Sequence, residues 1–371
     1  MGLYTFTYMA IGVLTPLISQ YLKSIGFSGA EIGTVTAAGT CTAIFASAFW
    51  GKIYTIMERR HLLVMLLCLM AAAVSMIISH VDVFPVFLIL FAVMYFFQAP
   101  VMSLSDALAM SDGQPFGFVR MFGAAGFAAG VFIAARISDA AGLEWIFPMY
   151  CISYVIAAAV IFSISRTRQK PKAADKAKKN GGYIRLLADK KYIKLVICAF
   201  FMCGTNVANN TYFGFLYIEG GGALAGVGIA FLLMAGSEAP IMAWTKWLSE
   251  KLTSEKLILI AMIVSVLRFA WYATEPPYYL LLALFALQGI VNGIILVEFV
   301  RYISALVSRE LNGMAIAAFY SFSSSGSTIL CQLAGGFLLD KTGAGGVYLF
   351  FSLFNLTGLI LYMIFGLYKR E

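Results

Sequence analysis

Charged residues are scarce in this sequence, and their scarcity excludes an ordinary water-soluble fold. Of the 371 residues, 12% are Asp, Glu, Lys or Arg, whereas 61% are hydrophobic. A soluble domain carries roughly 25% charged residues and could not bury so much apolar surface. The composition therefore predicts a protein that crosses the lipid bilayer several times.

Residues that bind metals or nucleotides are few or badly placed. The two histidines flank one apolar run from opposite ends, and the six cysteines form no C-x-x-C pair, so we interpret the cysteines as small buried hydrophobes. The sequence has no G-x-x-x-x-G-K-[ST] phosphate loop. It also lacks a nucleophile–base pair within the apolar runs. We therefore expect no metal site, no cofactor other than a proton as coupling ion, and no enzymatic activity.

Long apolar runs are what the sequence does contain. Twelve of them have about 20 residues or more, the length that a helix needs to cross a membrane: 2–22, 30–57, 62–80, 84–109, 116–138, 144–165, 192–218, 223–248, 257–274, 277–303, 311–338 and 346–368. They predict an all-α membrane protein with twelve transmembrane helices in two pseudo-symmetric six-helix bundles. The first run has no basic region before it, unlike a signal peptide, and starts almost at Met1, so a short leader is expected to be missing.

One long polar segment, 166–191, separates six runs from the other six and is rich in Lys and Arg. We predict an N-terminal bundle at 1–165, a basic linker at 166–191 on the lipid surface and a C-terminal bundle at 192–371. Basic residues gather in the loops on the linker's side, which places both termini in the cytoplasm of a cell (inner) membrane. Because these charges lie in short loops between spans, no nucleic-acid partner is expected. We expect a functional monomer in the lipid bilayer.

The two halves of the chain resemble each other. Trp-x-Lys occurs at 50–52 and again at 244–246, and Asp-x-x-Gly occurs at 139–142 and again at 340–343. The distance along the chain between the two copies is nearly the same for both motifs, so the motifs predict a duplicated six-helix unit. A site near the midplane between two such repeats is typical of transporters.

Five ionisable residues interrupt the apolar runs: Asp106, Arg120, Glu238, Arg268 and Glu298. A charge inside a bilayer costs roughly 2.5–3.5 kcal/mol on insertion scales, so such residues are expected to face a water-filled cavity. Burial favours a neutral carboxyl group, and a nearby guanidinium favours its charged form. An arginine that moves can therefore couple proton binding to the side of the membrane from which the site is accessible. A structural salt bridge is the alternative for Asp106 with Arg120 and for Glu238 with Arg268. A charge at the helix end is the alternative for Glu298.

Amide side chains form a second candidate set. Asn206 and Asn210 are four residues apart and share a helix face, and Gln288 and Asn292 repeat that spacing. Amides that face a cavity can bind the hydroxyl groups of a substrate, and hydrogen bonds between helices are the alternative. Glycines at 117–130 and small residues at 321–327 predict close helix packing.

The segment FGFVRMFGAAGF at 116–127 resembles the lactose permease around its sugar-binding arginine. IVSVLR at 263–268 is similar to the span of that family whose arginine takes part in proton coupling, and 313–343 resembles the eleventh span of the wider branch. The chain thus resembles the branch of the major facilitator superfamily that contains the lactose permease, nucleoside–proton symporters and phenylpropionate permeases. By this resemblance, Arg120 binds substrate and Asp106 is its acidic partner.

The same resemblance places Glu238 near a span-eight glutamate and gives Arg268 a role in modulating a proton site. The lactose permease has a histidine and a glutamate where this chain has Gln288 and Val291, and its sugar-stacking tryptophan falls at Phe127. These departures argue against lactose itself as the substrate.

We therefore predict a secondary active transporter that takes up a small polar organic solute (a sugar, glycoside or nucleoside) with protons, by alternating access. The expected substrate-binding residues are Asp106, Arg120, Phe127, Asn206, Asn210, Gln288 and Asn292. The expected proton-coupling residues are Glu238, Arg268 and Glu298. The alternatives are a proton-coupled exporter of a drug or metabolite and a permease for an aromatic acid. The fifth apolar run, 116–138, has glycines but lacks the proline of a typical exporter motif, which argues against export.

Overall fold

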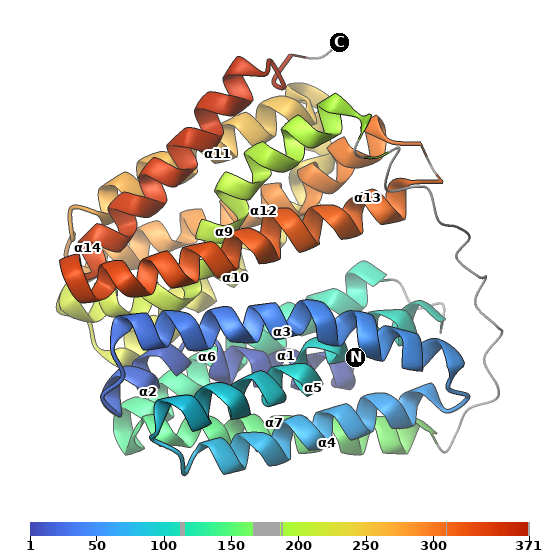
Figure 1. Cartoon of the computed structure of the whole chain (residues 1–371), viewed down its shortest axis with the longest axis vertical. Coiled ribbons are helices and arrows are strands. Elements are labelled where there is room, and N and C mark those ends of the chain that lie inside the picture. The colour runs from blue at the N-terminus through green and yellow to red at the C-terminus, as the bar shows by residue number, and fades with distance from the viewer. Residues whose placement is uncertain (112–115, 166–185, 187, 309, 370–371) are drawn as a thin grey trace. The chain divides into compact units, whose positions relative to one another are not determined.

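The computed structural model describes residues 1–111, 116–165, 186, 188–308 and 310–369. The side chains of 109–111, 116–120, 164–165, 243, 246 and 250 are not described. Every regular element in the described residues is helical (Figure 1). The chain divides into two compact units, Met1–Asp175 with Ala223–Leu232, and Lys176–Gly222 with Leu233–Glu371. The predicted bundle boundaries at 165 and 192 stay predictions.

The N-terminal half contributes these helices: α1 (Gly2–Leu14), α2 (Ile18–Ser24), α3 (Gly29–Ile56), α4 (Arg60–Ile78), α5 (Phe84–Ser111), α6 (Phe116–Ala141), η1 (Leu143–Trp145) and α7 (Ile146–Ser165). The start of α3 is set by a capping box, in which the Ser28 hydroxyl accepts from the Glu31 N–H and the Glu31 carboxylate accepts from the Ser28 N–H.

The C-terminal half contributes α9 (Lys190–Glu219), α10 (Leu224–Leu252), α11 (Ser254–Tyr272), α12 (Tyr278–Leu306), α13 (Asn312–Phe319), the π-helix η2 (Tyr320–Gly326) and α14 (Ser327–Ile364). The π-helical segment interrupts the run predicted as one helix at 311–338. Such segments are rare and occur mostly within α-helices at functional sites.

Twelve membrane-length segments are present in the described residues. Ten helical stretches are long and apolar enough to cross a membrane. One of these, Asn312–Ile364, has 53 residues and would be about 80 Å long, far more than the roughly 30 Å hydrocarbon core, so it represents two crossings. It breaks at Gly343, where φ is 71°. The nineteen residues of α11 supply the remaining crossing. The predicted twelve-helix fold is therefore confirmed.

The two halves repeat the same pattern of neighbours. In the first, α1 packs against α6 and α7, and α4 packs against α5 and α7. In the second, α9 packs against η2 and α14, and α11 packs against α12 and α14. The two parts of α14, before and after Gly343, thus correspond in chain order to α6 and α7. This correspondence is the duplication that the Trp-x-Lys and Asp-x-x-Gly echoes predicted.

Small residues bring the paired helices together in both halves. A Cβ atom at Gly126 or Gly130 of α6 would collide with the backbone carbonyls of Thr5 or Met9 on α1. In the second half, the hydroxyls of Ser323 and Ser327 donate to the carbonyl oxygens of Val196 and Phe200 on α9. The expectation of close packing is confirmed for these positions.

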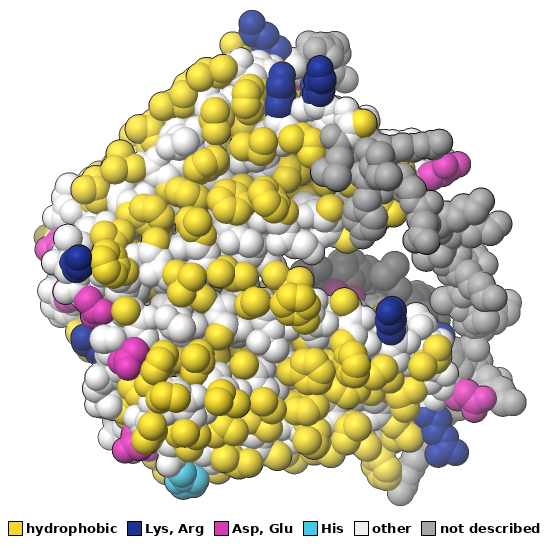
Figure 2. Space-filling view, in the orientation of Figure 1, with side chains coloured by type: hydrophobic (Ala, Val, Ile, Leu, Met, Phe, Trp, Pro, Cys, Tyr) yellow, Lys and Arg dark blue, Asp and Glu magenta, His cyan; other side chains and the backbone are white. Residues whose placement is uncertain are grey.

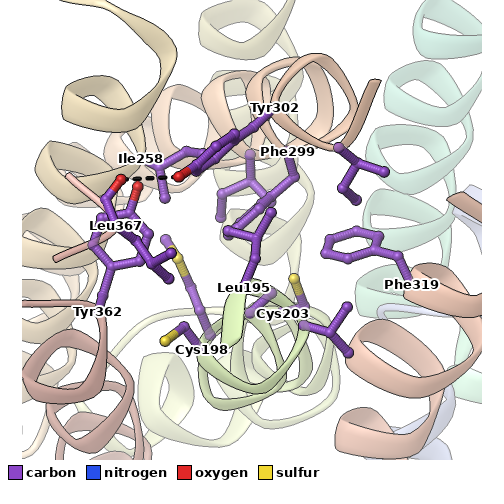
Figure 3. Close-up of a cluster of buried hydrophobic side chains, with 14 of the residues drawn as sticks. Leu195, Cys198, Cys203, Ile258, Phe299, Tyr302, Phe319, Tyr362 and Leu367 are labelled. Carbon is purple, nitrogen blue, oxygen red and sulfur yellow. Dashed lines mark hydrogen bonds between the residues drawn. The ribbon is translucent and has the colours of Figure 1, made fainter. Parts of the chain in front are cut away.

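The core and the surface of the helices are both apolar. Figure 3 shows the core of the second unit, where Leu195, Cys198 and Cys203 of α9 lie in one buried cluster with Ile258, Phe299 and Tyr302 of the neighbouring helices. Four cysteines are buried as expected, but Cys41 is exposed. On the face in Figure 2, hydrophobic side chains cover much of the helical surface and charged ones are few. An apolar exterior of this kind suits contact with lipid.

Candidate functional site

Three helices of the second unit bring polar side chains together at Asn206. The Arg268 Nη2 on α11 donates to the Asn206 Oδ1 on α9 at 3.0 Å. From α12, the Gln288 Nε2 donates to the Asn206 backbone oxygen at 3.0 Å. Asn206, Arg268 and Gln288 are all buried. The sequence predicted each of them as a site residue, and the structure joins them in one network.

Arginine fixes the orientation of the Asn206 amide. Its guanidinium can only donate hydrogen bonds, so the Asn206 oxygen must point toward Arg268. The Asn206 Nδ2 then points back along α9 and donates to the Met202 carbonyl oxygen at 2.9 Å. With both ends engaged, Asn206 is a fixed part of the site.

A cavity of about 140 Å³ lies beside this network. Its polar lining comes from Asn206, Asn210 and Asn292, with Tyr320 and Ser324 of the π-helix η2. Its apolar lining comes from Cys203, Val207, Ile295, Leu296 and Phe319. No charged residue lines it among those described, and the buried Oδ1 of Asn210 has no hydrogen-bond partner there. The cavity therefore offers amides, hydroxyls and aromatic rings to a neutral ligand.

A second line of buried polar contacts ties α9, α11 and α14 together. The Thr205 hydroxyl donates to the Asn355 Oδ1 at 2.8 Å, and the Asn355 Nδ2 donates to the Ser265 Oγ at 2.8 Å. The Tyr348 hydroxyl donates to the Asn209 Oδ1 at 2.8 Å. Sequence reasoning missed Asn355 and Tyr348. Asn355 could have been found as an isolated amide within the last apolar run.

Arg268 has an unusual environment for a charged residue. Its side chain is 3% exposed, and its Cζ lies 4.4 Å from the Phe269 ring centre and 5.8 Å from that of Tyr272. A desolvated cation–π contact contributes about 2 kcal/mol, whereas an unpaired buried charge costs several kcal/mol. The Arg268 Nε and Nη1 have no acceptor in the described part of the chain. The aromatic rings alone do not compensate for burying this charge.

Glu238 and Arg268, predicted together as a proton site, are not hydrogen-bonded to each other. Asn206 is the one side chain that accepts a hydrogen bond from Arg268 among the described residues. Glu238 is half-buried on α10. Their role in proton coupling stays a prediction.

Glu298 lies inside the helix bundle rather than in a loop. Its side chain is 0% exposed, and its Oε1 lies 2.7 Å from the Arg301 Nη1 one turn further along α12. The same Nη1 donates to the Ser249 Oγ on α10 at 2.5 Å. The Glu298 Oε2 has no partner within the described residues. This carboxylate is therefore part of a polar link between α10 and α12.

In the first unit, Asp106 pairs with a residue that the sequence did not single out. The Tyr4 hydroxyl on α1 donates to the Asp106 Oδ1 on α5 at 2.6 Å, and the Tyr4 ring stacks on Tyr8. The side chain of Arg120 lies outside the described residues, so its predicted pairing with Asp106 stays a prediction. Phe127 lies on α6, with its ring centre 6.2 Å from that of Phe231.

Comparison with known proteins decides the family. A family model described as the MFS_1-like family matches residues 1–350. The chain belongs to the MFS_1-like family. The members of this family are transporters of the major facilitator superfamily, so the chain is a multi-pass membrane transporter and not an enzyme.

Members of the superfamily resemble the chain along its whole length. A maltose permease of Geobacillus stearothermophilus is 30% identical, over 99% of this chain and 93% of that protein. A probable 3-phenylpropionic acid transporter of Escherichia coli K12 is 22% identical, over 93% of this chain and 91% of that protein. The crystal structure of the nucleoside transporter NupG superimposes with a TM-score of 0.84 at 16% identity, over 100% of this chain and 98% of that chain. At that identity the structure supports the fold alone.

Proposed function

We propose that this protein is a secondary active transporter that takes up a neutral, hydroxyl-rich solute together with protons. A sugar or glycoside is the first candidate and a nucleoside the second. Transport would proceed by alternating access between the two repeats, in a functional monomer with both termini in the cytoplasm. The basic linker and loops support that orientation.

The cavity in the second unit is the observation that supports this class of solute. Its polar groups are the uncharged side chains of Asn206, Asn210, Asn292, Tyr320 and Ser324. Amides both donate and accept, so they match the paired donors and acceptors of sugar hydroxyls. The maltose permease relative supports the same class. Asp106, Arg120, Phe127 and Gln288 remain proposed solute contacts.

Glu298 is the proposed proton site that the contacts support best, and Glu238 and Arg268 remain further proposed proton-coupling residues. Its buried carboxylate lies 2.7 Å from the Arg301 Nη1, and its Oε2 has no partner among the described residues. We propose that Arg301 and a proton alternate as partners of this carboxylate during transport. Because Arg301 also bonds Ser249 on α10, such an exchange would link proton binding to a movement of α10 against α12.

Uptake into proteoliposomes under an imposed pH gradient tests the proposal. We expect labelled maltose to accumulate when the interior is alkaline, and unlabelled glycosides to compete more strongly than a nucleoside or 3-phenylpropionate. Glu298→Gln should reduce gradient-driven accumulation about tenfold or more, while solute exchange across the membrane continues. Glu310→Gln, at an exposed position, is the matched control and should transport normally.

Three results would contradict parts of this proposal. Accumulation independent of the gradient would remove proton coupling. Competition by 3-phenylpropionate alone would identify an aromatic acid permease. Accumulation only when the gradient is reversed would identify an exporter.

A further inference from the structure

Hydrogen-bond donors without acceptors gather around Arg268. The Arg268 Nε and Nη1 have no partner within the described residues, and the same is true of the Tyr272 hydroxyl and the Asn209 Nδ2. All three side chains are at least nine-tenths buried. Buried donors in native proteins nearly always have partners, so a cluster of unpaired ones needs an explanation.

These donors come from two helices and lie around the same pair of rings. The Arg268 Cζ lies 5.8 Å from the Tyr272 ring centre, and that ring makes an edge contact with Tyr348 at 5.2 Å. The Tyr348 hydroxyl, on α14, holds the Oδ1 of Asn209 and leaves its Nδ2 free to donate. Helices α9 and α11 therefore supply buried unpaired donors, one of them charged, next to the contacting rings of Tyr272 and Tyr348.

No acid balances this charge among the described residues. The acceptor that Arg268 does have is the neutral amide of Asn206. Arg301, in the same unit and 37% exposed, has Glu298 at 2.7 Å. The more deeply buried arginine is thus the one without a carboxylate, which is the reverse of what desolvation requires.

We propose that the donors of Arg268, Asn209 and Tyr272 bind a small monovalent anion, either a halide ion or a single carboxylate group. One guanidinium balances one negative charge, and the neutral N–H and O–H groups complete its hydrogen bonds. The charge of Arg268 would repel a metal cation, and a dianion would lack a second positive charge to balance it. The proposal does not depend on which solute the protein transports.

The cavity adjoins this site through one residue. Asn206 lines the cavity and also accepts from Arg268, so the cavity and the proposed site share this side chain.

Thermal unfolding of the full-length purified protein tests the proposal, because a ligand that binds the native state raises its midpoint. Sodium isethionate, with its bulky sulfonate, is replaced by chloride or bromide at constant ionic strength. In a second arm, 3-phenylpropionate is compared with its uncharged amide. We expect a saturable rise of several degrees in one arm. A response to halide alone identifies an inorganic ion, and a response to the carboxylate alone identifies an organic acid.

Variants link the response to this site. Asn206→Asp places a carboxylate at hydrogen-bond distance from Arg268, so it should abolish the response, as should Arg268→Gln. Arg136→Gln is the control, because Arg136 also lies over a phenylalanine, Phe132, but is exposed; it should keep the full response. An unresponsive wild-type midpoint, or an equal response in Asn206→Asp, would overturn the proposal. The wild-type titration decides this even if a variant fails to fold.

Discussion

At the scale of single residues, isolated polar side chains join the apolar helices of the second unit. Asn355 is wholly inside the unit and bonds Thr205 on α9 and Ser265 on α11. In lipid, apolar surfaces gain little by meeting each other, so packing and hydrogen bonds between helices hold the bundle together. Asn355 therefore has a larger structural role than its single place in the last apolar run suggests.

Asn355→Ala is predicted to destabilise the protein by about 1–3 kcal/mol, because it leaves the buried Ser265 hydroxyl without this partner. Unfolding in mixed micelles measures the change. Asn312→Ala is the control, since Asn312 bonds Ser304 at the exposed surface, and its effect should stay within about 0.5 kcal/mol. Equal effects of the two substitutions would show that the Asn355 network does not hold the helices together.

At the scale of helices, close backbone contact sets the pairing of α1 with α6. Gly126 has the Thr5 carbonyl in the space that a Cβ atom would fill. Gly236 on α10 is also within a helix, but a Cβ atom there would meet nothing within 4 Å. Glycine is therefore required for close packing at position 126 but not at position 236.

Gly126→Ala is predicted to lower the thermal midpoint strongly, because α1 and α6 must separate to admit the methyl group. Gly236→Ala should leave the midpoint unchanged or raise it slightly, since alanine favours a helix by up to about 1 kcal/mol over glycine. Fluorescence-monitored melting of both variants in one detergent makes the comparison. A harmless Gly126→Ala would mean that α1 and α6 are less closely packed than described.

At the scale of the whole molecule, the apolar exterior makes the bilayer part of the folding environment. Leu69 lies at the middle of α4 and is 39% exposed, and Ile77 lies one residue before its end and is 55% exposed. In water these two positions would tolerate polar substitution about equally. In a membrane they differ in depth, and depth determines the cost of a charge.

Leu69→Lys is predicted to cost roughly 2.5–3.5 kcal/mol of insertion free energy and to reduce the yield of membrane-inserted protein. Ile77→Lys should cost much less, because a lysine near the helix end reaches the headgroups. Quantitative membrane fractionation measures both. Similar yields for the two variants would contradict the assignment of α4 as a transmembrane helix.

The sequence by itself determined the number and approximate limits of the spans, because each crossing requires about 20 apolar residues whatever its neighbours are. It also indicated where two helix backbones could approach closely, because the glycines of α6 have no side chain to keep a neighbouring helix away. The spacing of Asn206 and Asn210 placed them on one face, and both line the same cavity.

Only the tertiary structure decided which polar groups meet. Arg268 contacts the Asn206 amide instead of an acid, and Asp106 contacts Tyr4 from a helix about 100 residues away. Such contacts depend on the rotation and register of helices that are distant in the chain, and apolar periodicity constrains neither. The π-helix η2, which places Tyr320 and Ser324 at the cavity, shifts the register in the same way and has no signal in the apolar pattern.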